Sequence, residues 1–293
     1  MRAFEANVAK VTELLATGRT YSFEFFPPKT DAELLTLVQA LRDLQPLRPS
    51  FVSVTYRGGP SSRQRTTDLV RSMLRRTSLT PMAHLTCAGH SRLELADILV
   101  TFRKSGVENL MALGGDPLPD PAPPSELSYA LELVELARAV GGFCIGVAAH
   151  PDGNVRSPSL ASDREFLARK LQAADFAITQ FFFTVDDYLR LVDDLARRGV
   201  DKPVIPGVMP VTNLKQVPRM AQMGSPVPQH LVDAMEAAAA CGQDTWGIGT
   251  DAATELCTRL LDHGAPGLHF YTLNRSAATR QIYANLGLAP APA

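Results

Sequence analysis

The stretch FAITQFFFTVDDYLRLVDDLARRGVDKPVIPGV, from Phe176 to Val208, places a strand pattern, a helix pattern and a second strand pattern in succession. Its first and last parts, 176–181 and 203–208, are short runs rich in apolar, β-branched or aromatic residues. The middle part, 185–199, repeats apolar residues at helical spacing and ends in glycine, as helices commonly do. Strands that alternate with helices in this way run parallel, so the stretch predicts one β-α-β unit.

Strand patterns of the same kind recur along the whole chain. Six further runs begin at Tyr21, Phe51, Met82, Asn109, Phe143 and Gly267, which makes eight in total, and amphipathic helical stretches separate them. Eight such units favour a closed (β/α)8 TIM barrel over an open sheet, and 293 residues fit that fold. We expect a single barrel domain over residues 1–293, because no linker separates a second one.

Two segments interrupt this rhythm. Asp116–Glu126 (DPLPDPAPPSE) contains five prolines, which predicts an extended loop after the fourth strand. About sixty residues separate the last two strands, which is enough for extra helices on one rim of the barrel.

Composition argues against several classes of function. The 29 basic and 30 acidic residues leave a net charge of -1, whereas a nucleic-acid or anionic-membrane surface needs an excess of Lys and Arg. No run approaches the roughly 18 apolar residues of a membrane span, and the N-terminus lacks the apolar centre of a signal peptide. Four scattered cysteines without a CxxC pair predict reduced thiols. We therefore expect a cytoplasmic protein that binds neither nucleic acid nor membrane.

Polar residues occur at the ends of all eight predicted strands. Active sites of such barrels lie at the C-terminal ends of the strands. The residues at these ends are, in chain order, Glu24, Thr55, Tyr56, His84, Thr86, Asp116, His150, Gln180, Gln216, Asn274 and Arg275. A purely structural barrel would not need a polar group from every strand, so this pattern predicts an active site at one mouth.

Glu24 is the most unusual of these residues, because it lies in the apolar segment SFEFFPPKT (Ser22–Thr30). Glutamate is rarely buried unless it has a partner or a task. Apolar neighbours such as Phe23 and Phe25 favour the neutral carboxyl group that a general acid needs. We therefore predict a catalytic acid, with an ion pair to a core Arg or Lys as the alternative.

The other strand-end residues have structural explanations as well. Asp116 in GGDP could cap a turn, and His84 could be a hydrogen-bonded core histidine. Gln180 could be a satisfied polar residue at a strand end, and Arg275 could cap the last helix. The segment HLTC has no second His/Cys pair at ligand spacing, so we predict no metal site. The residues alone predict a barrel enzyme with a carboxylic acid and leave its substrate open.

Eight segments, taken in order, resemble the 5,10-methylenetetrahydrofolate reductases. They are SFEFFPPKT, PSFVSVTYRGG, HLTC, ALGGDP, AITQFFF, YLRLVDDL, IPGVMPVTNLKQ and GLHFYTLNRS, within a match from about residue 20 to residue 287. The resemblance implies a flavin-binding (β/α)8 barrel that reduces 5,10-methylenetetrahydrofolate to 5-methyltetrahydrofolate for methionine synthesis and methylation. It also implies that NADH or NADPH reduces a non-covalent FAD before the folate takes the hydride. Related bacterial enzymes form homo-oligomers, so we expect one here.

The resemblance assigns roles to individual residues. Glu24 matches the general acid that protonates N10 of the folate, and Asp116 matches an acidic residue near flavin and pterin. Positions matching flavin contacts are Thr55, Tyr56, His84, Gly115, Asp116, Asp163, Arg169 and Lys170, and those matching folate contacts are Gln180, Gln216 and Arg275. For Arg169 and Lys170, an exposed helix end is the alternative to a contact with the FAD pyrophosphate.

Four positions near cofactor and substrate depart from the family pattern. Gly114 stands where the family usually has the arginine of RGD, His150 replaces a tyrosine, and Asn154 replaces a histidine. Met220 stands where many bacterial members have phenylalanine. These changes keep two alternatives open. One is a divergent paralogue with weak or no FAD binding and direct hydride transfer, and the other is a non-catalytic folate- or flavin-binding subunit.

Overall fold

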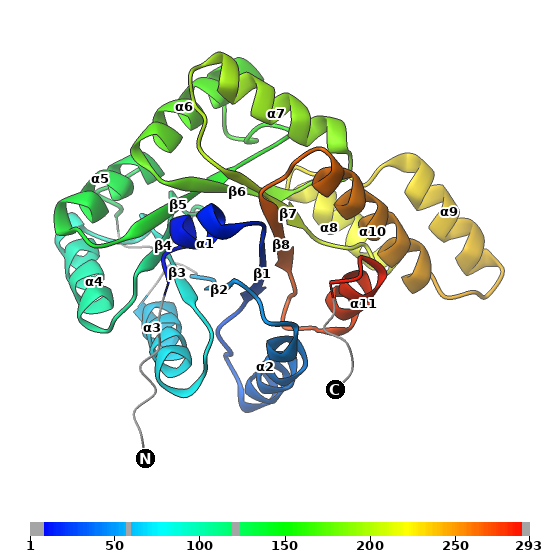
Figure 1. Cartoon of the computed structure of the whole chain (residues 1–293), viewed down its shortest axis with the longest axis horizontal. Coiled ribbons are helices and arrows are strands. Elements are labelled where there is room, and N and C mark those ends of the chain that lie inside the picture. The colour runs from blue at the N-terminus through cyan, green and yellow to red at the C-terminus, as the bar shows by residue number, and fades with distance from the viewer. Residues whose placement is uncertain (1–8, 57–59, 119–123, 289–293) are drawn as a thin grey trace.

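The computed structural model describes residues 9–56, 60–118 and 124–288, in which eight parallel strands form a closed barrel (Figure 1). The strands are β1 (Thr20–Phe25), β2 (Phe51–Val54), β3 (Pro81–Thr86), β4 (Asn109–Leu113), β5 (Cys144–Ala149), β6 (Phe176–Phe181), β7 (Val204–Val208) and β8 (Gly267–Tyr271). Each strand pairs with the next in the chain, and β8 pairs with β1 to close the barrel. The predicted (β/α)8 barrel is confirmed.

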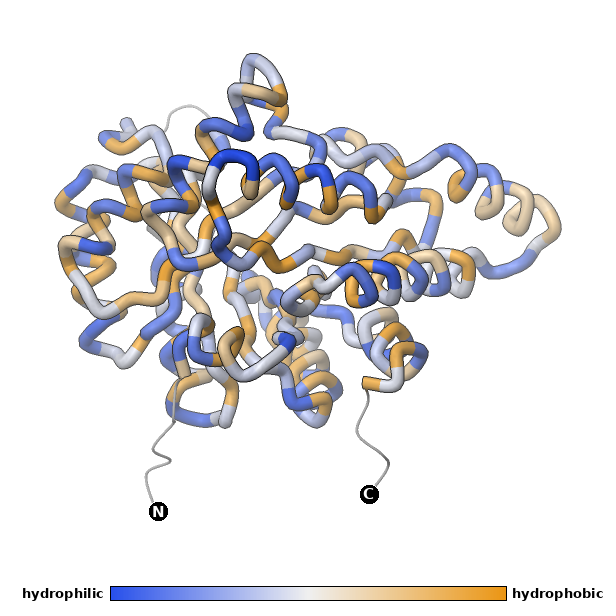
Figure 2. The backbone as a smooth tube through the Cα atoms, turned by 45° about the horizontal axis from the view of Figure 1, so that its top comes forward, coloured by the Kyte–Doolittle hydropathy of each residue, from blue (hydrophilic) through white to orange (hydrophobic). Residues whose placement is uncertain are grey.

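Helices surround the barrel and connect its strands (Figure 1). They are α2 (Asp31–Leu44), α3 (Pro60–Arg76), α4 (Arg92–Lys104), α5 (Ala130–Val140), α6 (Leu160–Ala173), α7 (Val185–Arg197), α10 (Trp246–Asp262) and α11 (Ala277–Asn285). In Figure 2 the outer helices alternate hydrophilic and hydrophobic colours, as amphipathic helices do. No helix in the described ranges is long and apolar enough to cross a membrane.

The predicted extra helices lie in the long connection between β7 and β8. This connection contains the 3-10 turn η2 (Leu214–Gln216), then α8 (Val217–Gln222) and α9 (Gln229–Ala240), before α10. In Figure 1, α9 lies farthest from the barrel centre on this side. The proline-rich loop is described only at its two ends, since residues 119–123 lie outside the described ranges.

A short helix, α1 (Val11–Thr17), closes the end of the barrel opposite the mouth. The backbone N–H of Val11 donates to Asn109 Oδ1 at 2.8 Å, and Asn109 Nδ2 donates to the carbonyl of Ala9 at 3.0 Å. Val11 also joins the inner apolar cluster that contains Phe51 and Phe176. Because Asn109 begins β4, these contacts hold α1 over the N-terminal end of the strands.

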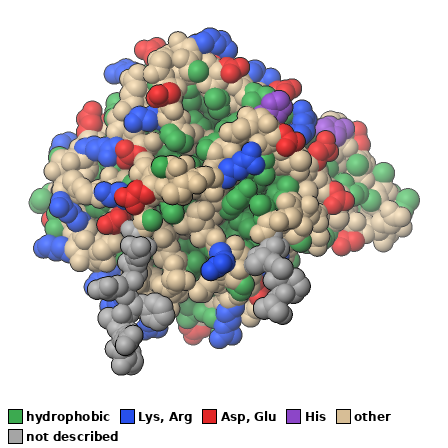
Figure 3. Space-filling model, viewed as in Figure 1, with side chains coloured by type: hydrophobic (Ala, Val, Ile, Leu, Met, Phe, Trp, Pro, Cys, Tyr) green, Lys and Arg blue, Asp and Glu red, His purple; other side chains and the backbone are tan. Residues whose placement is uncertain are grey.

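Strand alternation separates an outer core from the barrel interior. On β1, Phe23 and Phe25 join the outer cluster with Leu37 of α2, and the ring of Phe23 lies 5.3 Å from that of Tyr283 on α11. Glu24, between the two phenylalanines, therefore faces inward. Outside this core, Figure 3 shows positive and negative side chains mixed over the viewed face.

Candidate active site at the barrel mouth

Glu24 lies inside the barrel near the C-terminal end of β1 and is only 6% exposed. Strand pairing places Ser53 of β2 and Tyr271 of β8 beside it. Glu24 Oε2 accepts a long hydrogen bond from Ser53 Oγ at 3.5 Å and lies 3.6 Å from His84 Nε2 and 3.8 Å from His269 Nε2. Side chains of three other strands thus surround the carboxyl group.

The environment of Glu24 differs from the one expected from its sequence neighbours. Phe23 and Phe25 point away into the outer core, so the expectation that they surround the carboxyl group is wrong. The carboxyl group faces imidazole, hydroxyl and phenol groups instead. Among the described residues, no Lys or Arg forms an ion pair with Glu24, so the alternative of such a pair receives no support.

The two histidines beside Glu24 are held in different ways. Burial lowers the pKa of His84 to about 4, despite the opposing effect of Glu24, so His84 is neutral at pH 7 and its contact with Glu24 is not a full ion pair. Its Nε2 has no hydrogen-bond partner among the described residues. His269 Nδ1 instead lies 2.7 Å from Ser22 Oγ, and its Nε2 lies 3.4 Å from Ser53 Oγ. Sequence reasoning missed His269, although it lies on β8 two residues before Tyr271, on the same face.

Tyr271 crosses the mouth from β8 to β6. Its hydroxyl donates to the carbonyl of Thr179 at 2.6 Å, and burial raises its pKa well above the usual value. Gly207 on β7 makes this crossing possible, because a Cβ there would lie 2.6 Å from the Tyr271 ring and 2.3 Å from Thr179 O. The glycine in VIPGV is therefore required by close packing.

A cleft of about 1130 Å³ opens at the mouth beside β1, β2, β7 and β8. Four predicted residues, Thr55, Gln216, Asn274 and Arg275, line it together with Tyr271. Its charged lining consists of the basic residues Lys29, Arg65, Arg219 and Arg275 and the acidic residues Glu33 and Asp244. The cleft suits a ligand that carries negative charge.

The ends of β2 and β3 present polar atoms that lack partners. Thr55 Oγ1, Thr86 Oγ1 and His84 Nε2 are buried and unpaired in the described part of the chain. Next to them, Gly115 has a φ of +86°, and a Cβ there would lie 2.8 Å from Ala88 Cβ and 3.0 Å from Thr86 Cβ. Buried polar atoms are normally hydrogen-bonded, so this side fits a ligand with a polar ring system, such as a flavin.

The connection from β5 to α6 is fixed by a buried arginine that sequence reasoning missed. Arg164 is 2% exposed and pairs with Asp163 at 3.0 Å and Asp194 at 3.4 Å. It also donates to the carbonyls of His150 at 2.9 Å and Pro151 at 2.6 Å. The predicted cofactor residue Asp163 therefore has a structural partner of its own.

Lys170 and Arg169 lie apart although they are adjacent in sequence. Lys170 Nζ points inward and donates to the carbonyl of Ala148 at 2.6 Å, and burial lowers its pKa to about 8. Arg169 is exposed, with its guanidinium carbon 6.0 Å from the centre of the Phe166 ring. Neighbouring helical residues point about 100° apart, so only Lys170 faces the strands. The geometry gives no support to a joint pyrophosphate contact.

His150 and Gln180 follow the strands as expected. His150 is half-buried, and burial, helped by the positive charge of Lys170, lowers its pKa to about 4. Gln180 lies near the end of β6 and accepts from the N–H of Phe181 at 3.1 Å through Oε1. Asp116 is exposed in the turn after β4. These three residues remain candidates for ligand contacts.

Two predicted residues, Met220 and Tyr56, do not line the cleft. Met220 is 1% exposed and packs in a separate apolar cluster with Phe181 and Val211, so the structure does not bring it to the cleft. Tyr56 lies in the outer core, where its hydroxyl is 2.6 Å from His90 Nε2.

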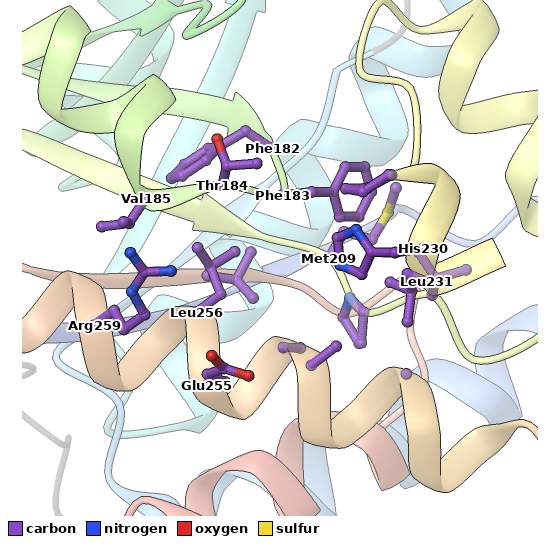
Figure 4. Close-up of a pocket in the computed structure, with 17 residues that line it drawn as sticks. Phe182, Phe183, Thr184, Val185, Met209, His230, Leu231, Glu255, Leu256 and Arg259 are labelled. Atoms are coloured by element: carbon purple, nitrogen blue, oxygen red, sulfur yellow. The ribbon is translucent and has the colours of Figure 1, made fainter. Parts of the chain in front are cut away.

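A second, smaller pocket of about 170 Å³ lies between the β6–α7 connection, α9 and α10 (Figure 4). Apolar side chains such as Phe182 and Leu256 form its walls, with Glu255 and Arg259 on α10 beside them. None of the predicted site residues lines it. In the described ranges, no group of three or more His, Cys, Asp or Glu side chains is arranged to hold a metal ion.

Comparison with known proteins connects this geometry to one family. The model of the family "Methylenetetrahydrofolate reductase" matches residues 10–287. The chain is 37% identical over 271 residues to 5,10-methylenetetrahydrofolate reductase of Pectobacterium carotovorum, covering 92% of this chain and 90% of that protein. It is 36% identical over 271 residues to the Escherichia coli K12 enzyme of the same name, covering 92% and 91%.

More distant proteins share the barrel region. Methylenetetrahydrofolate reductase (NADH) 1 of Arabidopsis thaliana is 33% identical over 299 residues, which cover 96% of this chain and 50% of the plant protein. A solved protein from Clostridium thermocellum, described as binding two copies of 5-methyl-5,6,7,8-tetrahydrofolic acid, superposes with a TM-score of 0.67. That match covers 95% of this chain and 97% of the other at 14% identity, so it supports the fold alone.

Proposed function

Because this chain belongs to the methylenetetrahydrofolate reductases, a family of oxidoreductases, we propose that Glu24 is the general acid in its reduction of 5,10-methylenetetrahydrofolate. The product is 5-methyltetrahydrofolate, and the hydride comes from NADH or NADPH by way of bound FAD. The name of the plant relative specifies NADH, which favours NADH here. From the resemblance, we also propose a cytoplasmic homo-oligomer that supplies methyl groups for methionine synthesis.

The position of Glu24 carries this proposal. Its carboxyl group is buried at the mouth and lacks a Lys or Arg partner among the described residues, so it is available to a bound ligand. A proton given to N10 of the folate lets the bond from N10 to the bridging carbon break. The resulting iminium at N5 accepts a hydride on that carbon, which becomes the methyl group. Positioned acid catalysis of this kind contributes about 10²- to 10⁴-fold.

Neighbouring side chains orient the acid. Ser53 donates to Glu24 Oε2, and His269 lies within 3.4 Å of the same serine hydroxyl. Ser22 Oγ lies 2.7 Å from the other ring nitrogen of His269, Nδ1. A continuous chain of polar contacts therefore leads from Ser22 through His269 and Ser53 to Glu24. His84 is neutral at pH 7, so it adds no positive charge beside the carboxyl group of Glu24. We infer that this arrangement fixes the carboxyl group and returns a proton to it after each turnover.

The two sides of the mouth suit two ligands. The unpaired atoms of Thr55, Thr86 and His84, with the glycine turn at Gly115, would hold FAD, which when bound passes hydride from nicotinamide to folate. The cleft beside β1, β7 and β8 would receive the folate, whose carboxylates suit the forked donors of Arg275. The exposed carboxylate of Asp116 would favour the cationic iminium.

The Glu24→Gln variant tests this assignment. With FAD bound, it should retain NADH-dependent reduction of menadione and lose folate reduction by about 10²- to 10⁴-fold. Glu135→Gln, on the exposed face of α5, is the matched control and should retain both activities. Full folate turnover in Glu24→Gln would contradict the role of Glu24. A colourless wild-type protein that cannot bind added FAD would contradict the flavin-dependent mechanism.

A further inference from the structure

The loop between β5 and α6 folds back toward the turn after β4. Within it, the N–H of Gly153 donates to the carbonyl of His150 at 3.0 Å, and the N–H of Ser157 donates to the carbonyl of Asn154 at 2.8 Å. Asn154 Oδ1 accepts from the N–H of Arg156 at 2.9 Å. Asn154 thus fixes the backbone on both sides of Val155 and directs Arg156.

Arg156 bridges this loop to the neighbouring strand end. Its Nη1 donates to the carbonyl of Gly115 at 3.0 Å, in the glycine turn described above. In the described part of the chain this is the one hydrogen bond of its guanidinium group, and no carboxylate pairs with it. An arginine has five N–H donors in a planar fork. Arg156 is exposed, so its remaining donors are available to a ligand with little further ordering.

A second cation lies on the same rim. Burial lowers the pKa of His150, and the positive charges of Lys170, Arg156 and Arg164 add to this effect while Asp163 opposes it. Lys170 Nζ donates to the carbonyl of Ala148 at 2.6 Å, and among the described residues no carboxylate forms an ion pair with it. The nearby carboxylate of Asp163 is paired with Arg164. Two cations without a carboxylate partner beside a glycine turn suit a phosphate group, which accepts several charged hydrogen bonds at once.

We propose that Arg156 binds a phosphate of the flavin dinucleotide at the rim between β4 and β5, with Lys170 beside it and Asn154 positioning it. This inference rests on the proposed function, because it requires FAD at the β2–β4 side of the mouth. The flavin is favoured over the nicotinamide dinucleotide because the unpaired atoms of Thr55, Thr86 and His84 lie on this side. Position 114 is glycine, so Arg156 supplies the guanidinium group that this turn itself lacks.

Binding of FAD and riboflavin to the apoprotein, measured by flavin fluorescence, tests the proposal. Arg156→Gln should weaken FAD binding about tenfold or more and leave the Kd of riboflavin unchanged, because riboflavin has no phosphate. Arg156→Lys should recover part of the affinity, and Asn154→Ala should weaken FAD binding less than Arg156→Gln. Arg75→Gln, an exposed arginine on α3, should change neither Kd.

A second substitution tests whether Arg156 replaces an arginine at position 114. A Cβ at Gly114 would lie 3.6 Å from Ser128 O, which is ordinary contact, so the backbone leaves room for a side chain to begin there, and Gly114→Arg is the variant to test. Added to Arg156→Gln, it should restore part of the lost FAD affinity, and a failure to do so would overturn the replacement.

Three results would overturn the phosphate contact itself. In the Arg156→Gln variant they are an unchanged Kd for FAD, an equal loss of FAD and riboflavin binding, and a higher KM for NADH with normal FAD binding. An equal loss for both flavins would indicate that Arg156 only stabilises the loop. A wild-type apoprotein that binds neither flavin would overturn the proposed flavin dependence as well, so the two failures are distinguishable.

Discussion

Lowering the pH from 7 to 5 should destabilise this protein through His84. Burial lowers the pKa of His84 to about 4 in the folded protein, whereas an unperturbed histidine has a pKa of 6.5. Because the folded pKa lies below the unfolded one, the unfolded chain takes up the proton first as the pH falls. Stability is therefore present above about pH 6.5 and is lost progressively between about 6.5 and 4.

The size of this effect follows from the two pKa values. Their difference corresponds to about 3 kcal/mol of unfolding free energy once the pH is below both. At pH 5 the histidine of the unfolded chain is almost fully protonated while buried His84 is mostly neutral. About 2 kcal/mol of this contribution should therefore be lost between pH 7 and pH 5.

Urea unfolding followed by circular dichroism at both pH values measures this loss. Wild type should lose about 2 kcal/mol more than His84→Asn between pH 7 and pH 5, because the other titrating groups are common to both proteins. His263→Asn, which removes an exposed histidine, should behave like wild type. Equal losses in wild type and His84→Asn would refute the reasoning. If His84→Asn does not fold, an NMR titration of His84 in wild type that gives a pKa near 6.5 would refute it equally.

Three further predictions concern other groups. Affinity for FAD should fall with rising pH above about 8, by up to about tenfold per pH unit, because neutral Lys170 must regain its proton before it can interact with the phosphate. The Lys170→Arg variant should remove this pH dependence, and an unchanged profile in that variant would contradict the role of Lys170. The Gly207→Ala variant should lower the unfolding free energy by about 1–3 kcal/mol, because its Cβ would lie 2.3 Å from Thr179 O. Gly247→Ala, where a Cβ would have open space, is the control in thermal unfolding. Equal Tm values for the two variants would count against this packing. At pH 8 a thiol reagent should label the exposed Cys241 rapidly and leave Cys87 unlabelled, because burial raises the pKa of Cys87 to about 12. Fast labelling of two thiols in the native protein would contradict this burial.

The sequence was sufficient for the fold because barrel formation depends on local patterns. The predicted strand 176–181 agrees with β6, the run predicted to begin at Asn109 begins β4, and the helix pattern from 185 to 199 agrees with α7. These patterns arise because one side of each strand or helix is buried, and the polarity of each side chain shows on which side its residue lies. Glu24 could be selected for the same reason, as a carboxylate in an apolar strand.

The partners of that carboxylate could not be predicted in the same way. The residues next to Glu24 in the sequence predicted that phenylalanine rings surround its carboxyl group, but those rings lie on the other face of β1. His269 is more than 240 residues away in the chain and reaches Glu24 only because β8 pairs with β1. Its place on the inner face of β8 was the available signal.

The same distinction holds for the cofactor side of the mouth. The resemblance assigned Arg169 and Lys170 together to the FAD pyrophosphate, but adjacent residues on a helix point in different directions, and only Lys170 faces the strands. The packing of α8 buries Met220. The contact between Arg156 and Gly115 joins two loops 41 residues apart and depends on how the β5–α6 loop folds back. The sequence by itself therefore determined the barrel and its family and singled out Glu24 as the candidate acid, because these follow from side-chain pattern and identity. Only the tertiary structure decided which polar groups meet, because that depends on strand register and loop direction.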